Sequence, residues 1–373
     1  MNQNIRVLFS CTGVDVINRG IESFFREAFN GLKSLDGLDM RLLTGIETAD
    51  DDEKKVWSLQ RSTQIAESIG RITGRSSYAI EQISSFPAVV SQIQKFKPHV
   101  IFSSEANLFF LLYRFRRYLG VPYKLLYSNG GPLEPPYHRM DFVHQVVPYY
   151  KQIALAAGEP ESKHLMVPYG IHVPKEDLNL PLAEKEALRI KLGLPTDRKI
   201  VISVGWISAS LKRMDYTINE MAAIPPEQRP FLLLLGNIDQ SSQEIIDLAR
   251  QKLNYTDYVI KSVPYTEVSD YYRAADIFVL SSLKEGFGRV YLEALMHNLP
   301  VVAHLSPVTQ YVIGEAGILT DLGVSGNLCK VIQNLMCSTT VGGKGRIYVK
   351  QKFDWEVLRP QYGAMFRQVA EHA

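Results

Sequence analysis

The sequence contains few cysteines, almost no net charge and no long apolar run. Cys11, Cys329 and Cys337 are its only cysteines in 373 residues, and their spacing fits neither a metal site nor a disulfide framework. Such thiols are typical of a reduced, cytoplasmic protein. Lys and Arg total 41 against 39 for Asp and Glu, which gives no reason to expect a nucleic acid partner.

The sequence also shows no segment typical of a membrane-spanning helix or of a signal peptide. The longest apolar runs, Leu108–Tyr113 and Phe231–Leu235, are far shorter than the roughly 18 residues of a spanning helix. A strand pattern begins at Ile5, without the regions of a signal peptide before it. The histidines lack the spacing of a metal motif, so we expect no metal and no cofactor. We expect a cytoplasmic protein whose membrane contact is at most peripheral, at the inner face.

Short apolar runs alternate with amphipathic segments along the chain, which is typical of parallel strands joined by helices. In the first half, the pattern predicts strands at 5–10, 41–43, 100–103, 123–127 and 165–167, and helices at 21–35 and 80–96. In the second half it predicts strands at 199–204, 231–235, 258–260, 277–280 and 301–303, and helices at 215–224, 241–253 and 288–297. The predicted fold class is α/β.

A linker is predicted at Tyr169–Leu182, which carries prolines and acids without apolar periodicity. The chain is long enough for two domains. The predicted domains are 1–173 and 174–354, each a Rossmann-like sheet with helices. Two such sheets facing across a cleft would bind ligands at the carboxyl ends of their strands.

Residues 281–295 follow a predicted strand and begin a helix. Gly286 and Gly288 allow a tight turn close to a ligand. The free N–H groups at the helix start favour an anion such as a diphosphate. Glu293, one turn inside the helix, could accept hydrogen bonds from a ribose diol, and Glu285 could reach a sugar. The alternative is an ordinary strand–helix connection.

A second loop supplies positive charge. Gly205 ends a predicted strand, and Lys212 and Arg213 precede the next helix. Lys212 could neutralise a leaving diphosphate, while Arg213 or Arg289 could bind it through two hydrogen bonds. The alternative is a solvated basic pair, although positive charges at a helix start oppose the helix dipole.

With these motifs, the second half resembles the donor domain of glycosyltransferase family 4, whose members are retaining enzymes of the GT-B fold. The family's two glutamates, separated by seven residues that include a Gly-Phe-Gly turn, match Glu285 and Glu293. Its glycine and lysine loop matches Gly205 and Lys212. The match runs from about residue 199 to residue 319.

The resemblance implies a role for each matching residue. Glu285 and Lys212 would be catalytic, with Glu285 on the transferred sugar and Lys212 on the diphosphate. Glu293 would bind the ribose, and the segment from Val263 to Val268 would flank the base. Other donor-binding residues would be Gly205, Phe287, Gly288, Arg289 and Val290. Residues 355–373 resemble a C-terminal helix that packs back on the first domain.

One position departs from the family. An arginine usually follows the glycine of the lysine loop, and here Trp206 occupies that place. One of the two usual phosphate-binding cations is therefore missing. Our hypothesis is that Arg213 or Arg289 replaces it.

The first half, on the acceptor side, offers fewer motifs. Arg19 and Gly20 open a helix after the first strand, which resembles the family's glycine-rich first loop with one of its two glycines. Gly20 would let the backbone approach the donor phosphate, and Arg19 would add charge. The alternative is an ordinary turn. Glu105 and Asn129 follow later strands and are the acceptor-side candidates.

A basic and aromatic segment, Leu108–Lys124, includes Arg114, Arg116 and Arg117, and no acid occurs in residues 106–133. An interfacial helix on anionic lipid has this composition. The alternative is a core helix with a solvated basic end.

We therefore predict a retaining glycosyltransferase that moves a sugar from a nucleotide-diphosphate sugar, such as a UDP- or GDP-sugar, to an acceptor hydroxyl. The acceptor would be a saccharide or a lipid-linked molecule, in polysaccharide, glycolipid or other glycoconjugate synthesis. Two alternatives stay open. An epimerase or hydrolase of the same fold would form product without an acceptor, and a binding module would hold the nucleotide and turn nothing over.

Overall fold

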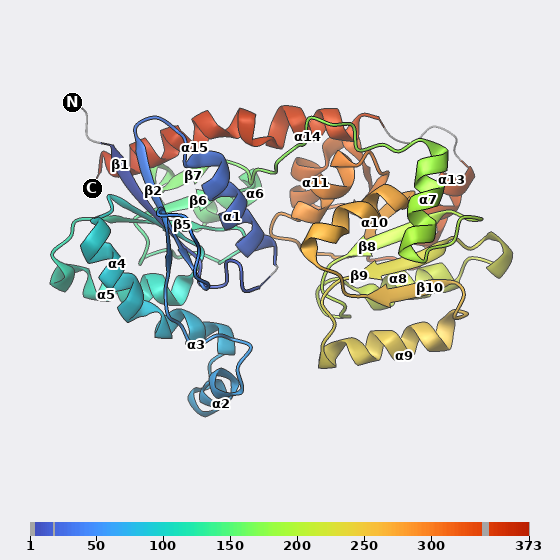
Figure 1. Cartoon of the computed structure of the whole chain (residues 1–373), viewed down its shortest axis with the longest axis horizontal. Coiled ribbons are helices and arrows are strands. Elements are labelled where there is room, and N and C mark those ends of the chain that lie inside the picture. The colour runs from blue at the N-terminus through green and yellow to red at the C-terminus, as the bar shows by residue number, and fades with distance from the viewer. Residues whose placement is uncertain (1–3, 18, 338–342, 373) are drawn as a thin grey trace. The chain divides into compact units, whose positions relative to one another are not determined.

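The computed structural model describes residues 4–17, 19–337 and 343–372. The chain forms two compact units, Met1–His172 with Phe353–Ala373, and Val173–Lys352. Each unit is a parallel sheet flanked by helices (Figure 1). The predicted fold class of two Rossmann-like α/β domains is therefore confirmed. In the described residues, no helix is both long and apolar enough to cross a membrane.

The first unit contains a seven-stranded sheet. Its strands are β1 (Ile5–Ser10), β2 (Leu38–Thr44), β3 (Glu53–Lys55), β4 (Val100–Ser103), β5 (Lys124–Ser128), β6 (Phe142–Gln145) and β7 (His164–Met166). Their order is β3-β2-β1-β4-β5-β6-β7, and every pair is parallel. The order reverses between β1 and β4, so the loops after these two strands diverge there.

Alternating side chains of the first sheet contact different helices. The helices are α1 (Gly20–Leu32), α2 (Gln64–Thr73), α3 (Ser77–Ser84), α4 (Phe86–Phe96), α5 (Ala106–Leu119), α6 (Pro148–Ala156) and α15 (Trp355–Ala370). Leu8 and Ile101 share one core with residues of α4 and α5. Phe9 and Phe102 point to the other face, where both contact Phe366 of α15.

Helix α15 completes the core of the first unit although it comes last in the chain. Its Trp355, Tyr362 and Phe366 are buried, and the ring of Trp355 stacks on that of Phe24 with centroids 6.1 Å apart. The hydroxyl of Tyr362 donates to the carbonyl of Pro168 at 3.0 Å. This C-terminal helix therefore covers one face of a sheet whose strands all come from the N-terminal part of the chain.

The second unit contains a six-stranded sheet. Its strands are β8 (Ile200–Val204), β9 (Phe231–Leu235), β10 (Tyr258–Lys261), β11 (Ile277–Leu280), β12 (Val301–His304) and β13 (Ile318–Thr320), in the order β10-β9-β8-β11-β12-β13. Its helices are α7 (Leu182–Leu192), α8 (Met214–Ala222), α9 (Gln243–Lys252), α10 (Val268–Ala274), α11 (Arg289–Met296), α12 (Pro307–Val312), α13 (Asn327–Cys337) and α14 (Gly345–Phe353). All neighbouring strands are parallel, and α8, α9 and α13 pack on one face of the sheet.

One predicted element differs in a way that the sequence explains. The helix predicted over 80–96 is two helices, α3 and α4, which end and begin around Ser85. Pro87 lies in the first turn of α4, where its missing N–H costs nothing, and it disfavours helical geometry in the residue before it. The apolar periodicity continues across this break, which is why a single helix was predicted.

Candidate functional site

The second sheet changes direction between β8 and β11. From β8 the chain builds β9 and β10 on one side, and it then returns to build β11, β12 and β13 on the other. The loops that leave β8 and β11 therefore open beside each other, at the place where parallel α/β sheets bind ligands. The predicted catalytic residues lie on these two loops.

Lys212 and Glu285 contact each other across this point. The Nζ atom of Lys212 donates to Oε1 of Glu285 at 2.6 Å, and both side chains are about four-fifths buried or more. The hydroxyl of Ser282 donates to the carbonyl of Leu211 at 2.8 Å, which ties the two loops together. A Cβ at Gly205 would lie 3.2 Å from the Lys212 side chain, so glycine leaves the space that this lysine uses.

A glycine also shapes the start of α11. Gly288 has φ +81°, a left-handed conformation that favours glycine, and its Cβ would lie 2.4 Å from the ring of Tyr291. Arg289 is the first residue of the helix and is buried, as is Phe287 before it, whereas Val290 is half-buried. The turn therefore presents the first N–H groups of α11 beside the loop that carries Glu285.

Two tyrosines hold Glu293. The hydroxyl of Tyr265 donates to its Oε1 at 3.3 Å and that of Tyr272 to its Oε2 at 3.0 Å. Burial and then the neighbouring carboxylate raise the pKa of Tyr272 well above its usual value, so this hydroxyl keeps its proton. Tyr265 lies two residues after Val263, in the segment that follows β10. Neither tyrosine was predicted; only Tyr265 had a signal, its place in the base-flanking segment.

Backbone carbonyls hold the guanidinium of Arg213, including that of Ser281 directly after β11, at 3.5 Å. Its guanidinium donates to the carbonyl of Leu322 at 2.6 Å and lies 4.4 Å from the ring centroid of Tyr216. These contacts fix the side chain against α8 and the segment after β13. The structure therefore brings Lys212, Glu285 and the start of α11 together, while Arg213 bonds to backbone carbonyls beside them.

The candidates of the first unit differ in exposure. Arg19 caps α1 without a side-chain cap bond and is exposed, as is Gly20, whose Cβ would meet no atom within 4 Å. Asn129 is buried, and its amide nitrogen donates to Tyr137 and Gln145 at 3.2 and 3.0 Å. Its amide oxygen accepts from a backbone N–H at 2.7 Å. The side chain of Asn129 thus fixes the loop after β5.

Glu105 is fully buried where the first sheet changes direction. Its Oε1 accepts hydrogen bonds from the N–H and the hydroxyl of Thr12, in the loop after β1. Its Oε2 has no hydrogen-bond partner among the described residues. Burial raises the pKa of Glu105 to about 7, although the bonds from Thr12 act in the opposite direction.

We expect Glu105 to make the stability of the first unit fall as pH rises. The folded pKa of about 7 lies above the ordinary value of about 4.3, so the carboxyl favours folding fully at low pH. That contribution is lost between about pH 4 and pH 7 and amounts to about 3–4 kcal/mol. Urea unfolding of wild type and Glu105→Gln at several pH values measures it, with Trp206→Phe in both so that fluorescence reports the first unit alone.

The exposed Glu47 provides the matched control for this experiment. Its side chain is 86% exposed, so Glu47→Gln should leave the pH profile of wild type unchanged. The unfolding free energy of wild type minus that of Glu105→Gln should fall as pH rises from about 4 to 7 and be constant above pH 8. Parallel profiles would mean that folding does not change the pKa of Glu105.

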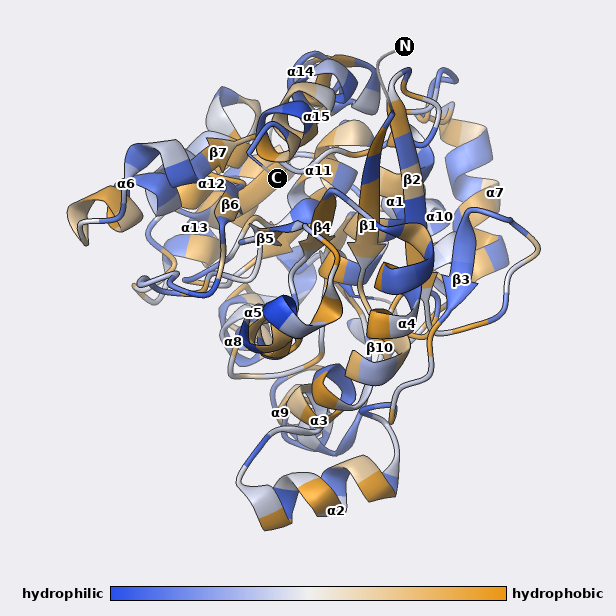
Figure 2. Cartoon of the chain, turned by 90° about the vertical axis from the view of Figure 1, so that its left-hand side faces the viewer, coloured by the Kyte–Doolittle hydropathy of each residue, from blue (hydrophilic) through white to orange (hydrophobic). Residues whose placement is uncertain are grey.

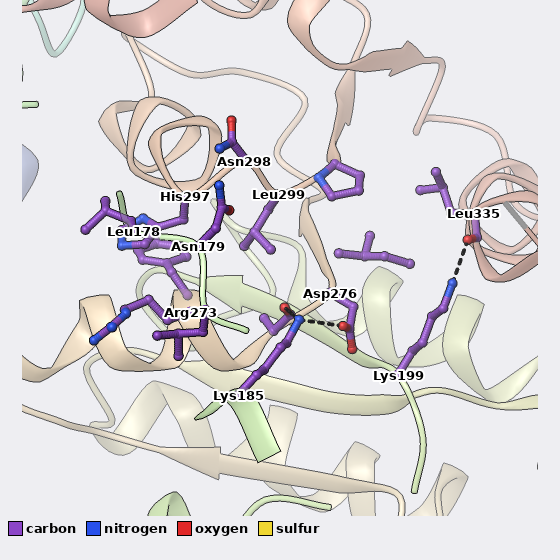
Figure 3. Close-up of a pocket in the computed structure, with 15 residues that line it drawn as sticks. Leu178, Asn179, Lys185, Lys199, Arg273, Asp276, His297, Asn298, Leu299 and Leu335 are labelled. Carbon is purple, nitrogen blue, oxygen red and sulfur yellow. Dashed lines mark hydrogen bonds and ion pairs between the residues drawn. The ribbon is translucent and has the colours of Figure 1, made fainter. Parts of the chain in front are cut away.

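A cavity of about 280 Å³ lies at the amino ends of the strands of the second sheet, the ends opposite the loops that carry Lys212 and Glu285 (Figure 3). Asp276, which directly precedes β11, bonds to Lys185 and Arg189 at its rim. Lys199 donates to the carbonyl of Leu335 at the end of α13. Residues 178–180 also line the cavity. Because its main charged groups bond within the unit and it lies at the amino ends of the strands, we do not place the candidate site there.

The sequence similarity to known proteins includes a family-model match within the second unit. Residues 198–338 match the family model described as glycosyl transferases group 1. A D-inositol 3-phosphate glycosyltransferase of Catenulispora acidiphila is 37% identical over 130 residues, which cover 32% of this chain and 30% of that protein. An alpha-monoglucosyldiacylglycerol synthase of Streptococcus pneumoniae is 29% identical, over 40% of this chain and 34% of that protein. This chain thus spans about a third of the length of these curated relatives.

Solved structures resemble the whole chain. Sucrose-phosphate synthase of Thermosynechococcus elongatus has a TM-score of 0.78 at 18% identity, and all of both chains is covered. HepE of Anabaena, solved with UDP and glucose, has a TM-score of 0.74 at 16% identity and covers 98% of this chain and all of its own. The fold class is therefore that of GT-B glycosyltransferases, and the second unit is similar in sequence to the group 1 glycosyl transferases.

Proposed function

We propose that this protein is a retaining glycosyltransferase that moves a sugar from a nucleotide-diphosphate sugar to an acceptor hydroxyl, with the donor bound on the second unit. The observation that carries the proposal is the pairing of Lys212 with Glu285 at the switch point of the second sheet. A cation and a carboxylate held beside a helix start match the charges of a diphosphate and the hydroxyls of a sugar.

The two members of this pair would separate when the donor binds. Lys212 would turn its ammonium from Glu285 to the diphosphate and stabilise the negative charge that develops as the phosphate leaves. Glu285 would then be free to accept hydrogen bonds from the sugar hydroxyls and orient the anomeric carbon. The leaving phosphate itself would accept the proton of the acceptor hydroxyl, so no further base on the second unit is required.

The nucleotide would lie along the loops that hold Glu293. This carboxylate is positioned by two tyrosine hydroxyls, and a ribose diol would add hydrogen bonds to the same oxygens. Val263 and Tyr265 would flank the base. Arg289 is the first residue of α11, next to the loop that carries Glu285, and is therefore our candidate for the cation that Trp206 replaces in the family's pattern.

The first unit would supply the acceptor side, with Arg19 and Gly20 near the donor phosphate and Glu105 and Asn129 shaping the acceptor site. The acceptor would be a saccharide or a lipid-linked molecule, and one relative, named as an alpha-monoglucosyldiacylglycerol synthase, supports this choice. We also propose peripheral contact of Leu108–Lys124 with an anionic membrane surface, at the inner face and from the cytoplasm. Exposed on α5 are Phe110, Tyr113, Arg114, Phe115, Arg117 and Tyr118, while its Leu108, Phe109 and Leu112 are buried.

Nucleotide binding provides the test of this proposal. UDP, GDP, ADP and their common sugars should be compared by thermal shift and calorimetry on wild type, Glu293→Ala and Arg289→Ala. One nucleotide should stabilise the wild type by about 2.7 kcal/mol at a hundredfold excess over its Kd. Glu293→Ala should lose most of that effect, and Arg289→Ala should lose affinity for diphosphates but not for the nucleoside. No response to any nucleotide would contradict the proposal.

A further inference from the structure

Helix α2 buries its small residues and exposes its large apolar ones. Ala66 and Gly70 are buried, whereas Ile65, Ile69 and Ile72 are 63%, 37% and 85% exposed. The three isoleucines are spaced at i, i+4 and i+7 and therefore lie on one face of the helix. We call them the isoleucine face. An amphipathic helix of a globular protein normally turns such a face to the core.

The packing of α2 fixes this orientation. A Cβ at Gly70 would lie 2.6 Å from the carbonyl oxygen of Arg75, so the buried face approaches the following chain too closely for a larger residue. Thr63 caps the helix start through a bond from the N–H of Ala66, and Gly74 ends the helix in a left-handed conformation. The helix is therefore well defined, and it holds the isoleucine face outward.

Because the isoleucine face is exposed, the fold lacks the stabilisation that burial of these side chains would contribute. Burial of an isoleucine side chain stabilises a fold, and most of that gain is missing at Ile65 and Ile72 and part of it at Ile69. A contiguous apolar stripe of this kind marks an interaction surface. The partner that covers the isoleucine face must provide an apolar layer and be compatible with the charged side chains around it.

Those charges are mostly positive. Arg71 and Arg75 are exposed at the end of α2, and the nearby acid Glu67 lies 3.9 Å from Arg71. Helix α3 packs against both α2 and α5, and Figure 2 shows α3 between them, with orange bands along α2. Helix α3 thus links the helix that carries the isoleucine face to the basic and aromatic helix α5 within the first unit. An apolar row beside arginines complements the interface of an anionic bilayer.

A second copy of the chain fits this surface less well. A standard protein interface buries roughly 800 Å² on each partner, around a packed core of apolar residues. Three isoleucines on about two turns of helix provide only a fraction of that area. A bilayer makes no such demand, because it covers an apolar row of any size.

We propose that α2 is a membrane-docking helix, which inserts its isoleucine face into the interfacial layer of an anionic bilayer while the arginines of α2 and α5 contact lipid headgroups. This inference concerns the first unit alone and does not depend on sugar transfer. It adds to α5 an element that penetrates the lipid, and it would place the first unit where a lipid-linked acceptor is found.

Vesicle sedimentation with the full chain tests the proposal. Vesicles of phosphatidylcholine with and without phosphatidylglycerol should be compared for wild type and the triple variant Ile65→Ser, Ile69→Ser, Ile72→Ser. Wild type should bind the anionic vesicles, and the triple variant should bind them at least tenfold more weakly. The control is Leu182→Ser, Ile190→Ser on α7, where the residues are 73% and 72% exposed; it should bind as wild type does.

A second measurement does not depend on loss of binding. Ile72→Trp should fluoresce at shorter wavelength with anionic vesicles and be quenched by lipids brominated in the acyl chain, beyond the quenching seen in wild type. Failure of wild type to bind, equal binding by the triple variant, or a wild-type dimer that the triple variant converts to monomer would each overturn the proposal. Nucleotide binding, measured on the same variants, should be unchanged, which separates this result from the test of the transfer function.

Discussion

Glu285→Gln should lower turnover by about 10²- to 10³-fold while nucleoside diphosphate binds as tightly as before, or about two- to fivefold more tightly. The two effects have opposite signs because Glu285 occupies Lys212 in the absence of donor. Loss of its charge frees the ammonium for phosphate and removes a nearby negative charge. The same substitution removes the acceptor that orients the sugar, and this contact matters only during transfer.

Steady-state kinetics and calorimetry on the same preparations measure these two effects. Glu227→Gln, on an exposed site of the same unit, serves as the control and should change neither quantity. Lys212→Met should weaken diphosphate binding and turnover together, since the lysine acts on the phosphate in both states. Turnover of Glu285→Gln equal to wild type would favour a role for the site in binding alone, and weaker nucleotide binding would mean that Glu285 shapes the site.

The second large effect is expected for stability. Arg61→Met should destabilise the first unit by about 3–5 kcal/mol. The side chain of Arg61 is 94% buried; its guanidinium donates to Glu81 and lies 3.1 Å from Glu22. The side chain of Glu81 is 99% buried and that of Glu22 is 96% buried. Glu81 also accepts from the backbone N–H of Arg61 at 3.0 Å. Removal of the guanidinium would leave two buried carboxylates without their cation.

Arg71→Met is the matched control because its ion pair with Glu67 is long and exposed, and such pairs contribute about 0–1 kcal/mol. Urea unfolding, followed by Trp57 and Trp355 in a Trp206→Phe background, reports the first unit. If Arg61→Met and Arg71→Met have the same urea midpoint of unfolding, then loss of the buried ion pairs of Arg61 does not destabilise the first unit.

The sequence predicted the sheets better than it predicted the contacts between side chains. Apolar runs mark strands such as Ile5–Ser10 and Phe231–Leu235 to the residue, because strands buried on both faces are continuously apolar. Strand β6 was not predicted. Its His144 and Gln145 are polar yet fully buried, and hydrogen bonds to Ser128, Val167 and other core groups satisfy them.

The candidate site shows the same limit. Loop glycines and charges at the strand ends indicated Lys212 and Glu285, but their contact joins residues 73 apart and depends on the order of the strands. Tyr272 could not have been predicted, because it lies on an ordinary helix and only the fold turns its hydroxyl to Glu293. The roles given to these residues stay predictions until the variants are measured.

Helix α15 has a consequence for synthesis. The first unit begins at the amino end of the chain, yet it lacks Trp355, Tyr362 and Phe366 until the 180 residues from Val173 to Lys352 have been made. At roughly 5–20 residues per second, that wait is on the order of ten to forty seconds. Meanwhile Phe9, Phe24 and Phe102 have no cover from the last helix. The domain that leaves the ribosome first is thus the last to be completed, and nascent chains should depend on chaperones at this stage more than the finished protein does.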